Sequence, residues 1–109
     1  MYQSFQKSRP ITLEKIDTIA DSLAPPMAEP YTYSICRRYV DEIVLVDDDQ
    51  LKSAMRHLFH ELKLAVEPAG AATTAGLLES LKDKVKNKKV GIIVCGSNIE
   101  PDNFHDLIS

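Results

Sequence analysis

The fold of this chain is decided by two stretches, VEPAGAATTAGLL at Val66–Leu78 and VGIIVCGSN at Val90–Asn98. The first has a proline where a helix can begin, and the small residues after it let another group approach the backbone very closely. That group is either the sheet itself or a flat ring, and the stretch alone does not decide between them. The second stretch is apolar without alternation, as in a strand covered on both faces. Together they predict an α/β fold in which a helix packs on a parallel sheet.

Apolar spacing and proline positions predict the elements around these two stretches. A helix from Pro30 places Ile35 and Tyr39 on one face, and the EIVLV run before Asp47 is β-branched like a strand. The expected elements are one or two helical turns at Tyr2–Lys7, helices from Pro30, from Asp47 or Asp48, from Pro68 to about Lys82 and from Pro101, and strands at Glu42–Val46 and Lys89–Val94.

A length of 109 residues is expected to form one domain, 1–109, of which 1–30 is mostly loop. Two short strands do not make a stable sheet, because three or more are normally needed. We therefore expect a partial three-layer unit, with a short parallel sheet and flanking helices, whose sheet continues in other sequence or in another copy. Uncovered sheet edges and apolar faces favour a homodimer or a larger assembly. The contact is expected at the strand edges or at the helix faces of Ile35–Val40 and Leu51–Leu62.

Composition and charge argue against several classes of partner. The formal net charge is −3, and the densest basic run, Lys82–Lys89, is interrupted as in a solvated helix end, so nucleic acid is not expected. No apolar run approaches the ~20 residues of a membrane span. The two cysteines, Cys36 and Cys95, are expected to be reduced thiols in a cytoplasmic protein, although the sequence leaves a disulfide between them open.

Three aspartates follow the first predicted strand, at Asp47–Asp49, as they do in phosphoacceptor receiver domains. Such a site needs a further carboxylate at the end of a later strand to complete the oxygen ligands of a magnesium ion. The later strand here ends at Cys95 instead, so helix capping is the preferred interpretation and a receiver-like domain is a distant alternative.

His57, His60 and Glu61 lie on one predicted helix, opposite its apolar stripe. Metal-binding histidines on a helix usually stand four residues apart, whereas these two stand three apart. The pattern is typical of a solvated face, and no metal site is predicted.

Cys95 is expected at the carboxyl end of a parallel strand, where open α/β sheets bind ligands. A catalytic cysteine needs a base, and no histidine is placed beside it by the sequence. From these residues alone, both Cys95 and Cys36 are interpreted as small buried hydrophobes.

Four motifs in chain order resemble the serine/threonine dehydratases, the fold-type II pyridoxal-phosphate enzymes that include threonine ammonia-lyase and serine racemase. The resemblance runs from about Tyr2 to Leu107 and corresponds to the C-terminal part of the catalytic domain. Each motif is weak singly, but the four keep the family's order and spacing. They are DTIADSLAPPM at Asp17–Met27, YSICRRYVDEIVLVDDDQLKSAMRHLF at Tyr33–Phe59, KLAVEPAGAATTAGLL at Lys63–Leu78 and KKVGIIVCGSN at Lys88–Asn98.

The resemblance implies roles for four cofactor-binding residues. Cys95 matches the hydroxyl or thiol residue that faces the pyridine nitrogen, and such a weak hydrogen-bonding group suits β-elimination from serine or threonine. Glu67 matches the carboxylate near the ring, Ser22 lies in the turn beside it, and Gly96 lies in the closing turn. The sequence departs from the family at Ser22, which replaces a glycine, and at Ser97, which replaces the second glycine of the closing turn.

The family's Schiff-base lysine, glycine-rich phosphate cradle and cation site belong to segments that this sequence does not match. With only four glycines, the chain holds no glycine cluster. The expectation is therefore a truncated dehydratase-like protein with no catalytic residues of its own. It is expected to bind no pyridoxal phosphate and to be inactive alone, with a complementary upstream fragment or a second copy as partner. A standalone, non-catalytic binding or assembly module is the alternative.

Overall fold

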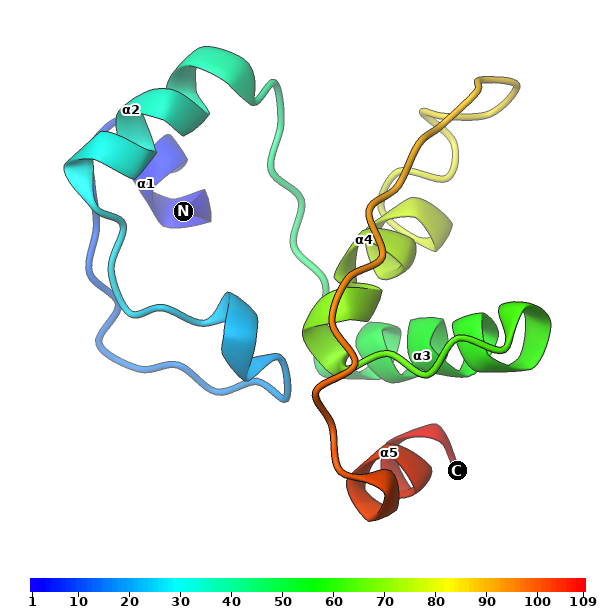
Figure 1. The fold of residues 1–109 in the computed structure, drawn as a ribbon. Coiled ribbons are helices and arrows are strands. Elements are labelled where there is room, and N and C mark those ends of the chain that lie inside the picture. Colours follow the sequence, from blue (N-terminus) through cyan, green and yellow to red (C-terminus); the bar gives the residue numbers. More distant parts are fainter. The chain divides into compact units, whose positions relative to one another are not determined.

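The computed structural model describes residues 1–109, and the chain divides into two compact units, Met1–Leu45 and Val46–Ser109 (Figure 1). The two units taken separately do not test whether residues 1–109 form a single domain, so the single domain stays a prediction. None of the helices is both long and apolar enough to cross a membrane.

The first unit consists of two helices joined by a long irregular segment. Helix α1 covers Tyr2–Gln6 and α2 covers Pro30–Tyr39, with a single 3₁₀ turn at Asp21–Leu23 between them. The helical turns predicted near the N-terminus are thus confirmed, and so is the helix start at Pro30. Proline suits the first turn of a helix because its missing amide would have no partner there.

Hydrogen bonds and ring contacts hold the first unit together. The buried Ser4 hydroxyl accepts a hydrogen bond of 3.0 Å from the Ile11 amide, which fixes the chain after α1. An antiparallel bridge pairs Thr12 with Met27 and closes the loop between them.

Ring contacts also join the two helices. Phe5 of α1 meets Tyr33 of α2 edge to face, with centroids 6.2 Å apart, and the Arg37 guanidinium lies 5.0 Å from the centroid of the Phe5 ring.

The second unit is a helical arrangement around α3 and α4, which cover Asp48–Leu62 and Pro68–Leu78. Asp47 caps α3, as predicted: its carboxylate accepts from the Gln50 amide at 2.8 Å, and the Gln50 side chain accepts from the Asp47 amide at 3.0 Å. This reciprocal pair satisfies two amides that the first turn of a helix leaves without partners.

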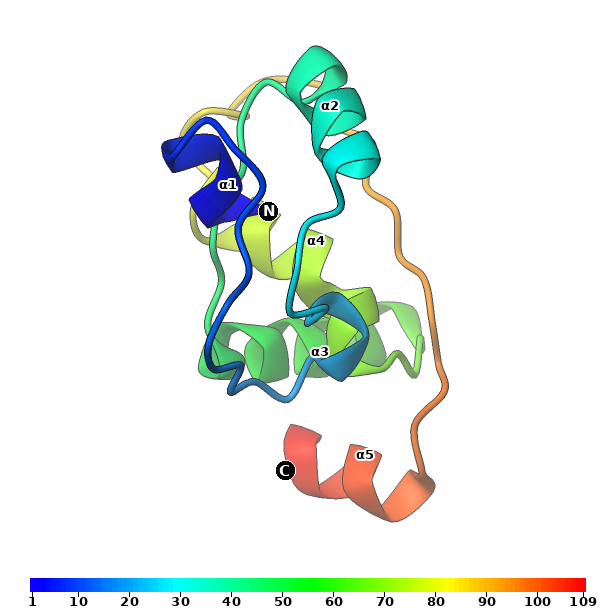
Figure 2. The ribbon, with the colours of Figure 1, turned by 90° about the vertical axis from the view of Figure 1, so that its left-hand side faces the viewer.

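The core of the second unit lies where α3 packs on α4 (Figure 2). Helix α3 contributes the large side chains and α4 the small ones, so the two backbones approach closely. The C-terminal helix α5, at Pro101–Ile108, packs on α3 through edge-to-face rings of Phe59 and Phe104, whose centroids are 5.4 Å apart. The buried apolar residues of the core are Leu51, Ala54, Met55, Leu58, Val66, Ala71 and Ala75.

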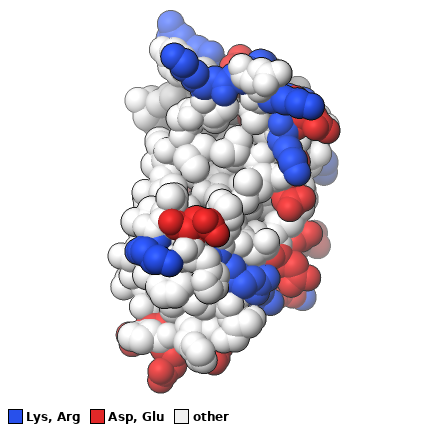
Figure 3. Space-filling view, turned by 90° about the vertical axis from the view of Figure 1, so that its right-hand side faces the viewer, with Lys and Arg blue, Asp and Glu red and all other residues white.

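The predicted parallel sheet is not formed within this chain. The segments Glu42–Val46 and Lys89–Val94 belong to no ladder, and the only bridge is that between Thr12 and Met27. A strand needs a hydrogen-bonding neighbour along its edge, and within this chain neither segment acquires one. Val90, Ile92 and Ile93 of the second segment are consequently exposed, with Ile93 at 75% of its full accessibility. Figure 3 shows a wide uncharged area on one face, with charged side chains of both signs around it.

Helix α4 is also shorter than predicted. It ends at Leu78, and the chain continues to Lys82 and beyond in a series of turns. The residues after Leu78 are mostly charged and exposed, so continued helix would have buried almost no additional apolar surface.

Candidate cofactor-facing site

The start of α4 lies directly on the turn that follows the second extended segment (Figure 1). The amide of Glu67, the residue that precedes α4, donates a hydrogen bond of 3.2 Å to the carbonyl oxygen of Gly96. The structure therefore brings three of the four predicted site residues together, namely Glu67, Cys95 and Gly96. They come from the two stretches with which the sequence analysis began.

Gly70 makes this close approach possible. A Cβ atom at position 70 would overlap the carbonyl oxygen of Cys95 and would lie 2.9 Å from the carbonyl oxygen of Gly96. Both obstacles are backbone atoms, which cannot rotate away as the end of a side chain can. The small residues at the start of α4 are thus explained by a backbone that touches the helix.

Gly96 is required at its own position for two reasons. Its φ angle is +77°, a conformation that residues with a Cβ atom rarely adopt. In addition, the carboxyl group of Glu67 occupies the place where a side chain at position 96 would begin: a Cβ there would overlap Oε1 of Glu67 and lie 2.9 Å from its Cδ. The Glu67 side chain is therefore folded over the turn.

Thr73 also joins this arrangement and was not identified by sequence reasoning. Its hydroxyl donates a hydrogen bond of 2.6 Å to the carbonyl oxygen of Ile93. The signal that could have found it is its spacing, because Glu67, Gly70 and Thr73 recur every three residues and so lie near one face of a helix.

Cys95 presents an exposed thiol, so its interpretation as a buried small hydrophobe is wrong. An unpaired extended segment explains the difference, since the prediction assumed a strand covered on both faces. Cys36, on α2, is half-buried. Both cysteines are free, and the disulfide that the sequence left open is not formed.

Ser22 lies in the first unit, within the 3₁₀ turn. Its amide donates to Oδ1 of Asp21 at 2.6 Å, and its hydroxyl donates to the same oxygen at 3.3 Å. The serine that replaces the family's glycine is thus held by its neighbour, and its part in the site stays a prediction.

No group of three or more His, Cys, Asp or Glu side chains is placed to hold a metal ion. His57, His60 and Glu61 are exposed on α3. The aspartates that suggested a receiver domain lie at the start of α3, where Asp47 is the capping residue.

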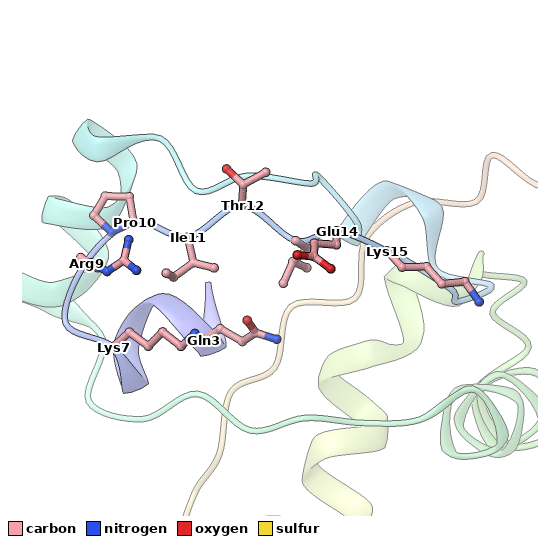
Figure 4. Close-up of a pocket in the computed structure, with 9 residues that line it drawn as sticks. Gln3, Lys7, Arg9, Pro10, Ile11, Thr12, Glu14 and Lys15 are labelled. Atoms are coloured by element: carbon pink, nitrogen blue, oxygen red, sulfur yellow. The ribbon is translucent and has the colours of Figure 1, made fainter.

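A cavity of about 630 Å³ lies in the first unit, between α1 and the segment that follows it (Figure 4). Its lining is polar and charged, whereas small-molecule sites are lined mostly by apolar side chains. None of the predicted site residues lines it. The lining residues are Gln3, Lys7, Arg9, Pro10, Ile11, Thr12, Leu13, Glu14 and Lys15.

The sequence of this chain is similar to known protein sequences. The family described as pyridoxal-phosphate dependent enzyme matches residues 1–96. A phenylserine dehydratase of Ralstonia pickettii is 46% identical over 104 residues, which are 95% of this chain and 32% of that protein. The chain therefore spans about a third of the length of this relative.

Two solved structures show the same backbone path. A maize serine racemase superposes with a TM-score of 0.84 at 34% identity, over 95% of this chain and 34% of its own. A threonine deaminase of Solanum lycopersicum superposes with a TM-score of 0.88 at 28% identity, over 95% of this chain and 29% of its own. The likeness is consistent with the predicted α/β fold, although the sheet is not formed here.

Proposed function

Because the chain belongs to the pyridoxal-phosphate dependent enzyme family, we propose that it is the C-terminal part of the catalytic domain of an ammonia-lyase. The reaction proposed for the complete enzyme is β-elimination from L-serine, L-threonine or a related β-hydroxy amino acid, followed by deamination to a 2-oxo acid. The observation that carries the proposal is the contact between Glu67 and Gly96, since it joins the two motifs through which the chain resembles the dehydratases. The dehydratase named among its relatives supports the same reaction class.

Pyridoxal phosphate, when bound, supplies an electron sink that weakens the bonds at the α-carbon of an amino acid. The residues present fit one edge of such a flat ring. The Cys95 thiol is exposed, and the turn at Gly96 has no side chain of its own. The structure thus offers one weak hydrogen-bonding group beside a turn over which the Glu67 carboxyl group is folded.

Cys95 is proposed to face the ring nitrogen of the cofactor. A thiol is a weak donor and a weak acceptor, so it does not hold a proton on that nitrogen as an aspartate would. Less charge is then drawn into the ring, which suits loss of a β-hydroxyl group. This is a chemical reason for a thiol at the position, and it holds whichever hydroxy amino acid is the substrate.

Glu67 is proposed to position the ring edge from the start of α4. Its side chain is half-buried against Gly96, which limits its freedom to move. Ser22 is proposed as a further cofactor-binding residue, because it lies in the DTIADSLAPPM motif through which the chain resembles the dehydratases.

The site on this chain is incomplete in the proposed enzyme. Covalent attachment of the cofactor needs a lysine in a defined pocket, and phosphate binding usually uses a glycine-rich helix start. Neither motif was found in the sequence, and the chain spans about a third of its relative. We propose that the chain alone neither retains the cofactor nor catalyses elimination.

The partner that completes the site is proposed to be the family's upstream sequence, or else a second copy of the chain. Exposed Val90, Ile92 and Ile93 support this proposal, because strand residues of this kind are normally covered by neighbouring strands and helices. The two free thiols favour a reducing, cytoplasmic setting.

A standalone assembly module is the second candidate function. The observation that favours it is the core between α3 and α4, which is closed within the second unit by itself. A module of this kind would use the exposed apolar segment to bind a second copy of the chain.

A titration of the purified chain with pyridoxal phosphate, followed by absorbance, separates the two candidates. The upstream two thirds of the Ralstonia pickettii phenylserine dehydratase provides the complementing partner. We expect a bound-cofactor spectrum only when that partner is present. Cofactor binding by the chain alone contradicts the incomplete site, and no binding in the mixture favours the standalone module.

A further inference from the structure

One side of α4 follows the segment that carries Cys95, residue by residue. Glu67 contacts Gly96 through its amide, Gly70 is packed against the carbonyl of Cys95, and Thr73 contacts Ile93 through its hydroxyl. As the residue number rises along the helix, it falls along the extended segment. The helix and the segment are therefore antiparallel.

The spacing of these contacts agrees with the geometry of the two elements. Six residues of α-helix, from Glu67 to Thr73, advance about 9 Å. Three residues of extended chain, from Gly96 back to Ile93, advance about 10 Å. The near-equality lets both ends of the contact form together, without a bulge or kink in the segment.

Thr73 differs from the other two contacts because it uses a side chain. Glu67 donates to the segment through its backbone amide, which most residues could supply. Gly70 approaches the segment because it has no Cβ atom. The contact at position 73 needs a side chain with a hydrogen-bond donor. Alanine and leucine, which are common in α4, have no such donor and could not replace Thr73. It satisfies a carbonyl in a segment that belongs to no ladder.

We propose that Thr73 is a positioning residue that holds Cys95 and Gly96 against Glu67. The hydroxyl anchors the segment two residues before Cys95, and the Glu67 amide anchors it one residue after. Between these anchors the Cys95 carbonyl is pressed on Gly70, so the thiol projects from a backbone fixed on both sides. The inference deepens the proposed function by naming what sets the position of Cys95, and only its consequence for catalysis rests on that function.

Amide hydrogen exchange of the full chain tests the proposal without any cofactor. The readout is the Glu67 amide, whose partner is the Gly96 carbonyl. The Ala71 amide, which donates to the Glu67 carbonyl at 3.2 Å, reports on the first turn of α4 itself. Thr73→Val removes the hydroxyl and keeps the shape, Thr73→Ala removes the whole branch, and Thr73→Ser restores the donor.

Thr74→Val is the matched control, because it makes the same change one position along the same helix. The Thr74 hydroxyl is buried and has no hydrogen-bond partner. Its loss therefore leaves the segment that carries Cys95 in place.

We expect Thr73→Val and Thr73→Ala to raise the exchange rate at Glu67 about fivefold, the effect of losing one net hydrogen bond. The Ala71 rate stays unchanged, and neither Thr73→Ser nor Thr74→Val raises the Glu67 rate. An unchanged Glu67 rate in both hydroxyl-free variants overturns the proposal. A joint rise at Glu67 and Ala71 also overturns it, because it shows that Thr73 merely stabilises the helix. Since no cofactor is present, the result is independent of whether the proposed elimination occurs.

Discussion

The backbone amide of Glu67 donates to the carbonyl oxygen of Gly96 at 3.2 Å, while the Glu67 carboxyl group lies where a side chain at position 96 would start. One residue thus holds the turn twice, through its backbone and through its side chain. The two residues are 29 positions apart in the sequence. Their contact depends on α4 being oriented with its first turn toward the segment that carries Cys95.

Gly96→Ala is expected to destabilise the second unit in a way that depends on Glu67. The positive φ angle alone costs about 1–2 kcal/mol for a residue with a Cβ atom, and the overlap with the Glu67 carboxyl adds to it. Urea unfolding of Gly96→Ala in the natural chain and in a Glu67→Ala background measures the two contributions. The loss should be smaller in the second background; equal losses would show that the carboxyl group does not crowd position 96.

Gly70→Ala is expected to lower the free energy of unfolding more than Gly91→Ala does. A Cβ at position 70 meets the backbone of Cys95 and Gly96, and such overpacking costs roughly 1–3 kcal/mol. Gly91→Ala is the control, because a Cβ at position 91 has nothing within 4 Å and the change should stay within about 0.5 kcal/mol. Equal free energies of unfolding for the two variants would contradict the close contact between α4 and the segment.

Thr74→Val is expected to stabilise the chain. The Thr74 hydroxyl is buried without a partner, and an unsatisfied polar group of this kind costs about 1–3 kcal/mol. Because valine keeps the branched shape, the gain should appear as a higher midpoint in urea with an unchanged slope. A loss of stability would indicate that the hydroxyl has a partner in solution.

Asp47→Ala is expected to reduce stability by about 1 kcal/mol, the usual effect of losing a helix cap. The substitution removes the acceptor for the Gln50 amide. Asp49→Ala is the matched control in the first turn of α3, because Asp49 makes only an exposed ion pair of 3.6 Å with Lys52. Thermal unfolding should show a larger loss of stability for Asp47→Ala than for Asp49→Ala. An equal loss of stability in the two variants would mean that charge alone stabilises this helix start.

The helix starts could be predicted from the sequence because their causes are local. Pro30, Pro68 and Pro101 each occupy the first turn of a helix, and Asp47 with Gln50 forms a cap within four residues. The close approach of another group to the start of α4 was also predicted, because only small residues permit it, but the sequence left open whether that group was the sheet or a flat ring.

The sheet and the contact of Thr73 could not be predicted reliably, because both depend on distant partners. An apolar run such as Val90–Val94 shows that a strand would be buried, but not whether its neighbours belong to the same chain. Thr73 and Ile93 are 20 residues apart. The three-residue spacing from Glu67 to Thr73 indicates a shared helix face, but it does not indicate which distant carbonyl that face meets. Cys95 was misjudged for the same reason, since its burial was inferred from a sheet that this chain does not form.

The release of 2-oxo acid from L-serine and L-threonine tests the central claim most directly. The purified chain is assayed with pyridoxal phosphate, first alone and then with the upstream two thirds of the Ralstonia pickettii phenylserine dehydratase. We expect no release by the chain alone and cofactor-dependent release by the mixture, with none from the upstream part by itself. Cofactor-dependent release of 2-oxo acid by the chain alone would contradict the claim.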